Sequence, residues 1–416
     1  MTDTATSAAP EKRNIAIWLV LLAAGGAFAL TMGVRQSMGL FLSALNTSTA
    51  LGVGSISLAF AFGQLWWGLT QPFAGAVADR IGTGRVILVG VLLVAIGTII
   101  TPLMTTTAGL IFAIGVLSAG GAGMAGPSVL MAASARLVPA SKRGLATGIV
   151  NAGGSFGQFA MAPIAIGLMA TVGWANAMQW MGVLALLALP AVWVLKGNSK
   201  AMAAADAAAT GTKALTAREA ISQALGTPSF RYLTIGFVVC GFHVAFLATH
   251  LPGVVAACGL PPAIGGWALA IIGLFNIFGS IAIGWAVGKW RMKTLLSLIY
   301  ASRGIAVLAF LLAPKTAPVM LVFAAVMGVT FLSVVPPTVG LVAKMFGTAN
   351  MAMLFGVAML GHQIGGFFGA FLGGYVFEHT GSYDLVWYID IALAVGAALI
   401  NLPIREARLP RAGLAT

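Results

Sequence analysis

Long apolar segments that carry almost no charge constrain this chain more than any other feature. No charged residue lies between Ile15 and Val34, and after Arg35 the next charged residue is Asp79. Such segments recur along the chain, and each is long enough to cross a hydrocarbon core of ~30 Å. Only 7% of the residues are charged, where a soluble domain carries roughly 25%. We therefore predict an all-α membrane protein with twelve membrane-spanning helices, at about 15–45, 54–78, 84–104, 108–135, 144–171, 175–195, 231–258, 262–288, 294–313, 317–345, 351–378 and 384–403.

The basic residues between these segments predict the orientation of the chain. If the N-terminus is cytoplasmic, 19 of the 22 Lys and Arg residues fall on the cytoplasmic side, and only Lys315 falls in an outside loop. Lys and Arg are enriched in the cytoplasmic loops of membrane proteins. We expect a multi-pass protein of the plasma membrane, of the bacterial inner-membrane type, with both termini in the cytoplasm. The net charge of +13 is thus distributed over short loops and does not predict a nucleic-acid partner.

The predicted spans divide into two groups of six around one long polar connection. A short amphipathic helix around 215–225 and a mostly flexible linker both fit the sequence of this connection. The expected organisation is an N-terminal tail at 1–14, a six-helix bundle at 15–196, a cytoplasmic linker at 197–230, a second six-helix bundle at 231–403 and a cytoplasmic tail at 404–416.

An internal repeat relates the two groups of spans. A shift of about 208 residues superposes glycines of the two halves, namely Gly120 on Gly328, Gly148 on Gly356, Gly153 on Gly361 and Gly157 on Gly365. With six spans each, the halves keep the same membrane orientation. Parallel repeats of this kind place a transporter's substrate site near mid-membrane, between the repeats.

One loop carries a family signature. The stretch "GAVADRIGTGR" at 75–85 resembles the loop between helices 2 and 3 of the major facilitator superfamily. The resemblance implies that Asp79 braces a neighbouring helix, and that the loop with Arg80 and Arg85 helps to gate alternating access. The equivalent stretch at 284–293 keeps basic residues but has Gly288 at the position of the aspartate.

Two further stretches resemble the monocarboxylate and oxalate transporter branch of that superfamily. They are "GVRQSMGLFLSAL" in the first span and "GHQIGGFFGAFLGG" in the eleventh. In the first stretch, Arg35 matches a basic residue of the monocarboxylate porters. The Asp/Arg pair that those porters carry in helix 8 falls near Asn276 and Ser280 here, and neither residue is charged.

Arg35 is the leading candidate for a substrate site. A central arginine in an isolated membrane helix costs from ~3 to 10 kcal/mol or more, so it normally faces a wet cavity or a partner. It can anchor an anion, or it can be a structural residue that binds carbonyl groups. The only acid clearly inside a span is Asp390, in a helix that is peripheral in the superfamily, and Arg303 in the peripheral ninth span has an expected structural role. Arg35 thus lacks an evident carboxylate partner, which favours an anionic substrate.

Four other residues complete the predicted substrate site. The repeat offset places His243 opposite Arg35, and histidine gains a proton near neutral pH; a packed structural histidine is the alternative. His362 adjoins a glycine stripe in the eleventh span, and Gln64 and Asn276 lie in spans expected to line a cavity. Each of these can instead serve an interhelical hydrogen bond.

The sequence lacks a phosphate-binding loop, an HExxH motif and a CxxC pair, so we expect no enzyme activity, no cofactor and no metal site. The predicted function is secondary active transport of a small organic anion, a monocarboxylate, coupled to H⁺ or to a counter-anion. Uptake of a larger neutral or weakly acidic metabolite, such as a vitamin or siderophore, and export of drugs are the alternatives. We expect the protein to act as a monomer in the lipid bilayer.

Overall fold

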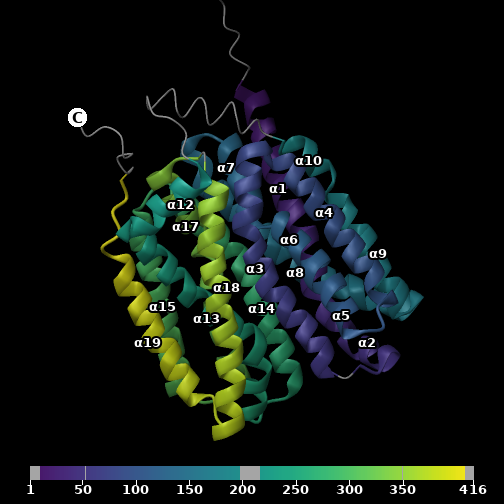
Figure 1. Cartoon of the computed structure of the whole chain (residues 1–416). Coiled ribbons are helices and arrows are strands. Elements are labelled where there is room, and N and C mark those ends of the chain that lie inside the picture. Colours follow the sequence, from purple (N-terminus) through teal and green to yellow (C-terminus); the bar gives the residue numbers. More distant parts are fainter. Residues whose placement is uncertain (1–9, 52, 197–215, 349, 408–416) are drawn as a thin grey trace, which may run out of the picture.

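The computed structural model describes residues 10–51, 53–196, 216–348 and 350–407, and its regular elements in these ranges are helices (Figure 1). Eleven helical segments among the described residues are long and apolar enough to cross a membrane. The 29-residue helix α3, Val53–Ile81, corresponds to the second predicted span and completes the set of twelve. The prediction of an all-α protein with twelve transmembrane helices in two bundles is confirmed.

The first half of the chain forms the first six spans. In chain order its helices are α1 (Pro10–Ser37), α2 (Leu42–Thr49), α3, α4 (Thr83–Ile100), α5 (Thr107–Leu110), the π-helix η3 (Ile111–Ala119), α6 (Gly120–Met124), α7 (Pro127–Leu137), α8 (Arg143–Val172), α9 (Trp174–Ala185) and α10 (Pro190–Val194). The fourth span consists of the run from α5 to α7, and the sixth of α9 and α10.

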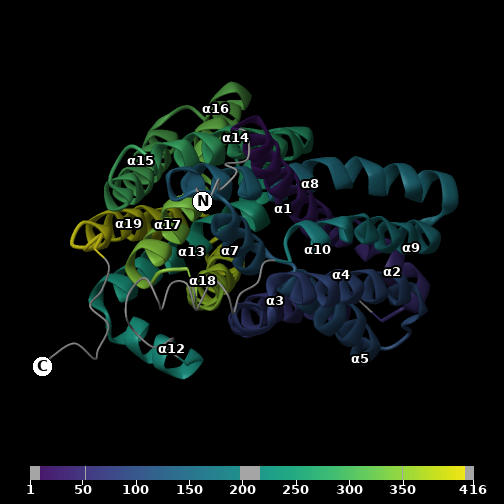
Figure 2. The same ribbon diagram turned by 90° about the horizontal axis from the view of Figure 1, so that it is seen from above.

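The second half forms the other six spans. Its helices are α13 (Pro228–Ala257), α14 (Pro262–Ala286), α15 (Met292–Leu312), α16 (Ala317–Thr330), α17 (Val335–Phe346), α18 (Met351–Thr380) and α19 (Asp384–Asn401). In the view from above, α4, α9 and α10 of the first half lie on the right, and α15, α16 and α19 of the second half lie on the left (Figure 2).

The two halves pack in the same way, as the repeat predicts. Within them, α1 packs on α8 and α13 packs on α18. Across the boundary between them, α8 packs on α14 and α18 packs on α3. The equivalent spans four and ten are both interrupted at equivalent points. The first interruption lies between α6 and α7, and the second between α16 and α17.

Of the polar connection between the halves, residues 197–215 lie outside the described residues. After them comes α12 (Ala217–Gly226), whose first turn is closed by a capping box between Thr216 and Glu219. Such a box satisfies backbone N–H groups that would otherwise lack partners at a helix start. Of the two interpretations that the sequence left open here, a short helix is present at Ala217–Gly226, and the next helix begins at Pro228. The outer tails at 1–9 and 408–416 also lie outside the described residues.

Candidate functional site

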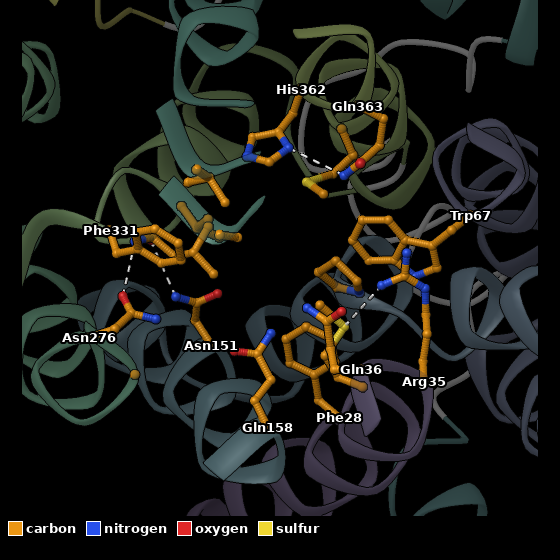
Figure 3. Close-up of a pocket in the computed structure, with 18 of the residues that line it drawn as sticks. Phe28, Arg35, Gln36, Trp67, Asn151, Gln158, Asn276, Phe331, His362 and Gln363 are labelled. Carbon is orange, nitrogen blue, oxygen red and sulfur yellow. Dashed lines mark hydrogen bonds between the residues drawn. The ribbon is translucent and has the colours of Figure 1, made fainter. Parts of the chain in front are cut away.

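A cavity of about 390 Å³ lies between the two halves. Its lining comes from α1, α3, α7 and α8 of the first half and from α13, α14, α17 and α18 of the second, together with the break between α16 and α17. Figure 3 shows the labelled side chains surrounding an open centre. Four of the five residues that the sequence predicted to bind substrate belong to this lining, namely Arg35, Gln64, Asn276 and His362.

Arg35 supplies the only Lys or Arg side chain of the described cavity lining. Its guanidinium donates a hydrogen bond to Gln64 Oε1, lies 4.6 Å from the centroid of the Trp67 ring and faces Met32 Sδ at 4.0 Å. The described lining contains no Asp or Glu. Because a guanidinium has five N–H donors, Arg35 retains donors that no group among the described residues accepts.

A chain of amide side chains extends from Arg35 across the boundary between the halves. Gln64 Nε2 donates to Gln363 Oε1 at 2.5 Å, and Gln363 Nε2 lies 3.2 Å from His362 Nδ1. His362 Nε2 is buried and has no hydrogen-bond partner. If His362 Nδ1 accepts from Gln363, the ring proton is on Nε2. Arg35 of α1 is thus linked through α3 to His362 of α18.

Asn276 belongs to a second polar group on the other side of the cavity. Its Nδ2 donates to Ser155 Oγ at 2.6 Å, and its Oδ1 accepts from the backbone N–H of Leu332 at 2.9 Å. Asn151 Nδ2 lies 3.2 Å from the carbonyl oxygen of Leu332 and 2.8 Å from Ser280 Oγ. Both ends of the Asn276 amide are therefore engaged in holding helices together.

Two cavity amides were missed by the sequence prediction. Gln36 follows Arg35 on α1 and is exposed, and Gln158 lies on α8; both line the cavity. Figure 3 shows the two side chains near each other and directed toward the open centre. The sequence did contain an indication of them, because both are uncharged polar residues within apolar spans. These spans, one and five, contain α1 and α8, which pack against each other.

His243 does not line the cavity, so the structure does not support its predicted position opposite Arg35. The neighbouring Val244 lines the cavity instead. An offset of 208 residues aligns Arg35 with His243, whereas an offset of 209 aligns it with Val244. One residue rotates a helical side chain by about 100°, which is enough to turn His243 into the second half. There its Nε2 lies 3.4 Å from Asp390 Oδ1, and its Nδ1 lies 3.5 Å from Arg303 Nη1.

The predicted gating residues lie at the end of α3. Asp79 forms a buried ion pair with Arg136 of α7, and its Oδ2 accepts a hydrogen bond from the backbone N–H of Met353 at 3.1 Å. Arg136 Nε also donates to the carbonyl oxygen of Thr348 at 3.0 Å. Asp79 and Arg136 therefore connect the first half to the start of α18 in the second. Arg80 and Arg85 are exposed at the same end.

The same end of the molecule is closed by direct helix contact. A Cβ atom added to Gly75 would lie 2.5 Å from the backbone of Ala352, and one added to Gly144 would lie 2.6 Å from the carbonyl oxygen of Gly284. The two helices α7 and α17 also contact the opposite half there, whereas η3 and α16 of the same spans pack within their own halves. Glycine permits this approach of backbones because it lacks a side chain. The halves thus meet tightly at the end of α3.

A helical bundle of two related six-span halves around a central cavity that contains an arginine and several amides is the architecture of a multi-pass membrane transporter. A family model of the Major Facilitator Superfamily matches residues 17–331 and 266–414. The chain therefore belongs to the Major Facilitator Superfamily.

Its relatives include named transporters of the branch that the sequence resembles. Monocarboxylate transporter 13 of Rattus norvegicus is 24% identical over 391 residues, covering 93% of this chain and 89% of the rat protein. An uncharacterized transporter of the superfamily from Bacillus subtilis (strain 168), YcxA, is 22% identical over 402 residues, covering 92% of this chain and 94% of its own.

Solved structures share the fold. The proton:xylose symporter XylE bound to 6-bromo-6-deoxy-D-glucose superposes with a TM-score of 0.73 at 16% identity, over 95% of this chain and 97% of its own. The fucose:proton symporter FucP of E. coli gives a TM-score of 0.65 at 14% identity, over 93% and 99% of the two chains.

Proposed function

We propose that this protein is a secondary transporter that moves a small organic anion, a monocarboxylate, across the membrane by alternating access. Cotransport of H⁺ or exchange for a second anion supplies the driving force. The observation that carries the proposal is Arg35, a cation in the central cavity without a carboxylate in the described lining. The names of the monocarboxylate transporters among the relatives support the same substrate class.

The cavity can bind a carboxylate through groups on one side. The free N–H donors of Arg35 form charge-assisted hydrogen bonds with the anion, which are about twice as strong as neutral ones. The amides of Gln36 and Gln158 point into the same space and can bind hydroxyl or keto oxygens. His362 lies across the cavity as an additional donor. A volume of about 390 Å³ is at the small end for ligand pockets, which favours a substrate of few carbon atoms.

Binding of the anion changes the balance between two conformations. In the state described here, the Asp79–Arg136 pair and the glycine contacts of α3 and α8 hold the halves together at one end. We infer from the basic loops that this end faces the cytoplasm, which makes the present state the one that loads from outside. A ligand shifts a conformational equilibrium only through its different affinities for the two states. The substrate therefore shifts the equilibrium toward whichever of the two conformations it binds more tightly.

The amide side chains of the cavity favour one alternative substrate class, a larger neutral or weakly acidic metabolite. Six of the residues that line the cavity are Asn or Gln, and amides bind the hydroxyl groups of neutral metabolites well. Uptake of a larger neutral or weakly acidic metabolite is therefore the second candidate. Export of cationic drugs has less support, because the described lining has no carboxylate to attract a cation.

A binding screen separates these candidates. The purified full-length protein is heated with acetate, lactate, pyruvate and benzoate, with the corresponding neutral amides, with sugars and with quaternary amines. We expect the carboxylates to raise the unfolding temperature and their amides to leave it unchanged, since a ligand that binds the folded state stabilises it. Stabilisation by sugars or amides alone would replace the anion with a neutral substrate, and stabilisation by amines alone would refute the anion site. Sedimentation analysis of the same sample tests the expected monomer.

A further inference from the structure

The second half contains a cluster of ionisable side chains away from the cavity. Arg303 of α15, His243 of α13 and Asp390 of α19 are each no more than 2% exposed. His243 lies between the other two, with Nδ1 3.5 Å from Arg303 Nη1 and Nε2 3.4 Å from Asp390 Oδ1. Groups of this kind inside a membrane are costly and are generally retained for function.

The geometry of the cluster determines which nitrogen of His243 carries the ring proton, and it leaves Asp390 able to bind a second proton. Arginine has only donors, so its approach to His243 Nδ1 makes that nitrogen the acceptor and leaves the ring proton on Nε2. His243 Nε2 lies 3.4 Å from Asp390 Oδ1, and neither atom has a hydrogen-bond partner among the described residues. An ionised carboxylate that lacks hydrogen bonds is expensive to bury. The site therefore offers Asp390 as an acceptor for a second proton.

Arg303 does not neutralise Asp390 by direct contact. Its Nη2 instead donates to the carbonyl oxygens of Thr330 and Phe331, the latter at 2.7 Å. These carbonyls lie at the break between α16 and α17. A purely structural ion pair would bring the guanidinium and the carboxylate together, because paired charges need good geometry to offset their desolvation. The imidazole lies between them instead.

The same break forms part of the cavity lining. Phe331 and Leu332 both line the cavity, and Leu332 is bound on that side by Asn276 and Asn151. Figure 3 shows Phe331 beside these two amides at the edge of the cavity. The backbone of residues 330–332 is thus bound by the ionisable cluster on one side and by the cavity amides on the other. A change in the position of Arg303 would move a segment that lines the cavity.

The other titratable groups near the cluster come from the helices packed against α19. On α15, Tyr300 donates to the carbonyl oxygen of Gly236 at 2.5 Å, and on α13, Cys240 faces the carbonyl oxygen of Phe331 at 3.8 Å. On α18, His362 faces the cavity. Lys293 binds the carbonyl oxygen of Leu402 at the far end of α19. Arg303 is therefore the one fixed positive charge within the cluster as described.

We propose that Asp390, His243 and Arg303 form the proton-binding site that couples H⁺ to anion movement, through the break between α16 and α17. This rests on the anion transport proposed above. Binding of H⁺ to the Asp390 carboxylate gives the neutral acid and changes the cluster from no net charge to a single positive charge. An anion in the cavity favours that positive charge, and the protonated cluster favours the anion to the same extent, because linkage is reciprocal.

Infrared difference spectroscopy tests the proton site without any substrate. Spectra of the full-length protein are recorded between about pH 5 and pH 9, around the range in which buried acids and histidines titrate. We expect the carbonyl band of a protonated carboxylic acid to grow as the pH falls and to be missing in Asp390→Asn. Asp384→Asn is the matched control, because Asp384 is exposed at the start of the same helix, and it should keep the band. A spectrum without a band that depends on Asp390 would overturn the proposal.

Transport measurements test the coupling. The protein is reconstituted in vesicles, and the carboxylate that gives the largest shift in the binding screen is used as the probe. A pH gradient of one unit supports at most about tenfold accumulation by a one-proton symporter. We expect Asp390→Asn to reduce the ratio to about one while exchange of labelled for unlabelled anion continues. His243→Gln should weaken the pH dependence, and Asp390→Glu should retain accumulation if Asp390→Asn does not fold.

The two proposals fail in different ways. If the screen shows no carboxylate binding, the anion substrate is wrong, and the infrared titration of Asp390 still decides whether the cluster binds a proton. If carboxylates bind and Asp390→Asn accumulates them as the unaltered protein does, the coupling role of the cluster is wrong and the anion site stands.

Discussion

Arg35 and Arg303 both lie in the interior of described spans, and their surroundings differ. Arg35 faces the central cavity, where its partners are an amide, a thioether and an aromatic ring. Arg303 is enclosed in the second half, where it contacts two backbone carbonyls and His243, and His243 in turn lies beside Asp390. The first has no neighbouring anion in the described structure, and the second shares its cluster with a carboxylate.

This difference separates a binding charge from a structural or coupling charge. A charge whose counter-ion belongs to the protein stabilises the fold or stores a proton. A charge that has no counter-ion within the protein can instead be neutralised by a bound ligand of opposite charge. Arg136 is a third case, because it pairs with Asp79 and both contact the start of α18 in the opposite half. A pair that spans the two halves can break and form during transport.

The largest effect is expected on removal of Arg303. Arg303→Leu should lower the free energy of unfolding by about 3–5 kcal/mol, because it leaves the Asp390 carboxylate buried without a cation. Thermal unfolding of the purified protein measures the loss. The double variant Arg303→Leu, Asp390→Leu should recover much of it, since a buried charge pair can often be replaced by apolar residues. Equal instability of the single and double variants would show that the two charges are not balanced against each other.

Removal of Arg35 should affect binding rather than folding. Arg35→Ala should weaken carboxylate binding by about 2 kcal/mol or more, which is roughly thirtyfold, because a charged hydrogen-bond partner is lost. Its unfolding temperature without ligand should stay close to that of the unaltered protein. Arg80→Ala is the control, since Arg80 is exposed at the end of α3. Anion affinity that survives in Arg35→Ala would contradict the role of Arg35.

A substitution can give Arg35 a neighbouring carboxylate, so that its surroundings resemble those of Arg303. Gln64 accepts a hydrogen bond from Arg35, so Gln64→Glu places a carboxylate against the guanidinium. We expect anion binding to fall by about 2 kcal/mol, roughly thirtyfold, and the protein without ligand to unfold at a higher temperature. Calorimetric titration and thermal unfolding measure the two effects. Gln64→Met, which removes the amide without adding charge, should weaken binding less; an equal loss would mean that charge is not the cause.

Loss of the pair between the halves should act on turnover. Asp79→Asn removes the charge that holds Arg136 and should slow transport about tenfold, the effect of ~1.5 kcal/mol from one charged hydrogen bond. Equilibrium binding should change little because Asp79 does not line the cavity. Uptake rates and binding are compared in the same preparation. A loss of affinity with an unchanged rate of transport would contradict a gating role.

Much of the fold follows from the sequence because the bilayer imposes simple rules. A spanning segment must satisfy its backbone hydrogen bonds internally, so long apolar segments predict helices. The spans predicted at 144–171 and 351–378 match α8 and α18 within two residues at each end. The interruptions at 125–126 and 331–334 were not predicted, since Gly and Pro also occur within continuous membrane helices.

The site was predictable only in part, because it depends on helix rotation. Arg35, Gln64, Asn276 and His362 were placed in the right helices and do line the cavity. His243 lies on a helix that lines the cavity but does not line it itself, since an error of one residue in the repeat offset turns a side chain by about 100°. Asp390 was considered peripheral, and its position beside His243 depends on how α13 and α19 pack, which no short-range pattern encodes.

The most direct test of the account is calorimetric titration of the protein with a carboxylate and with its neutral amide, lactate against lactamide. The two ligands have nearly the same shape and differ in charge. We predict that the unaltered protein binds lactate and not lactamide, and that Arg35→Ala binds lactate at least about thirtyfold more weakly. Equal affinity for the two ligands, or lactate binding that does not depend on Arg35, would contradict the claim that Arg35 binds the carboxylate of the substrate.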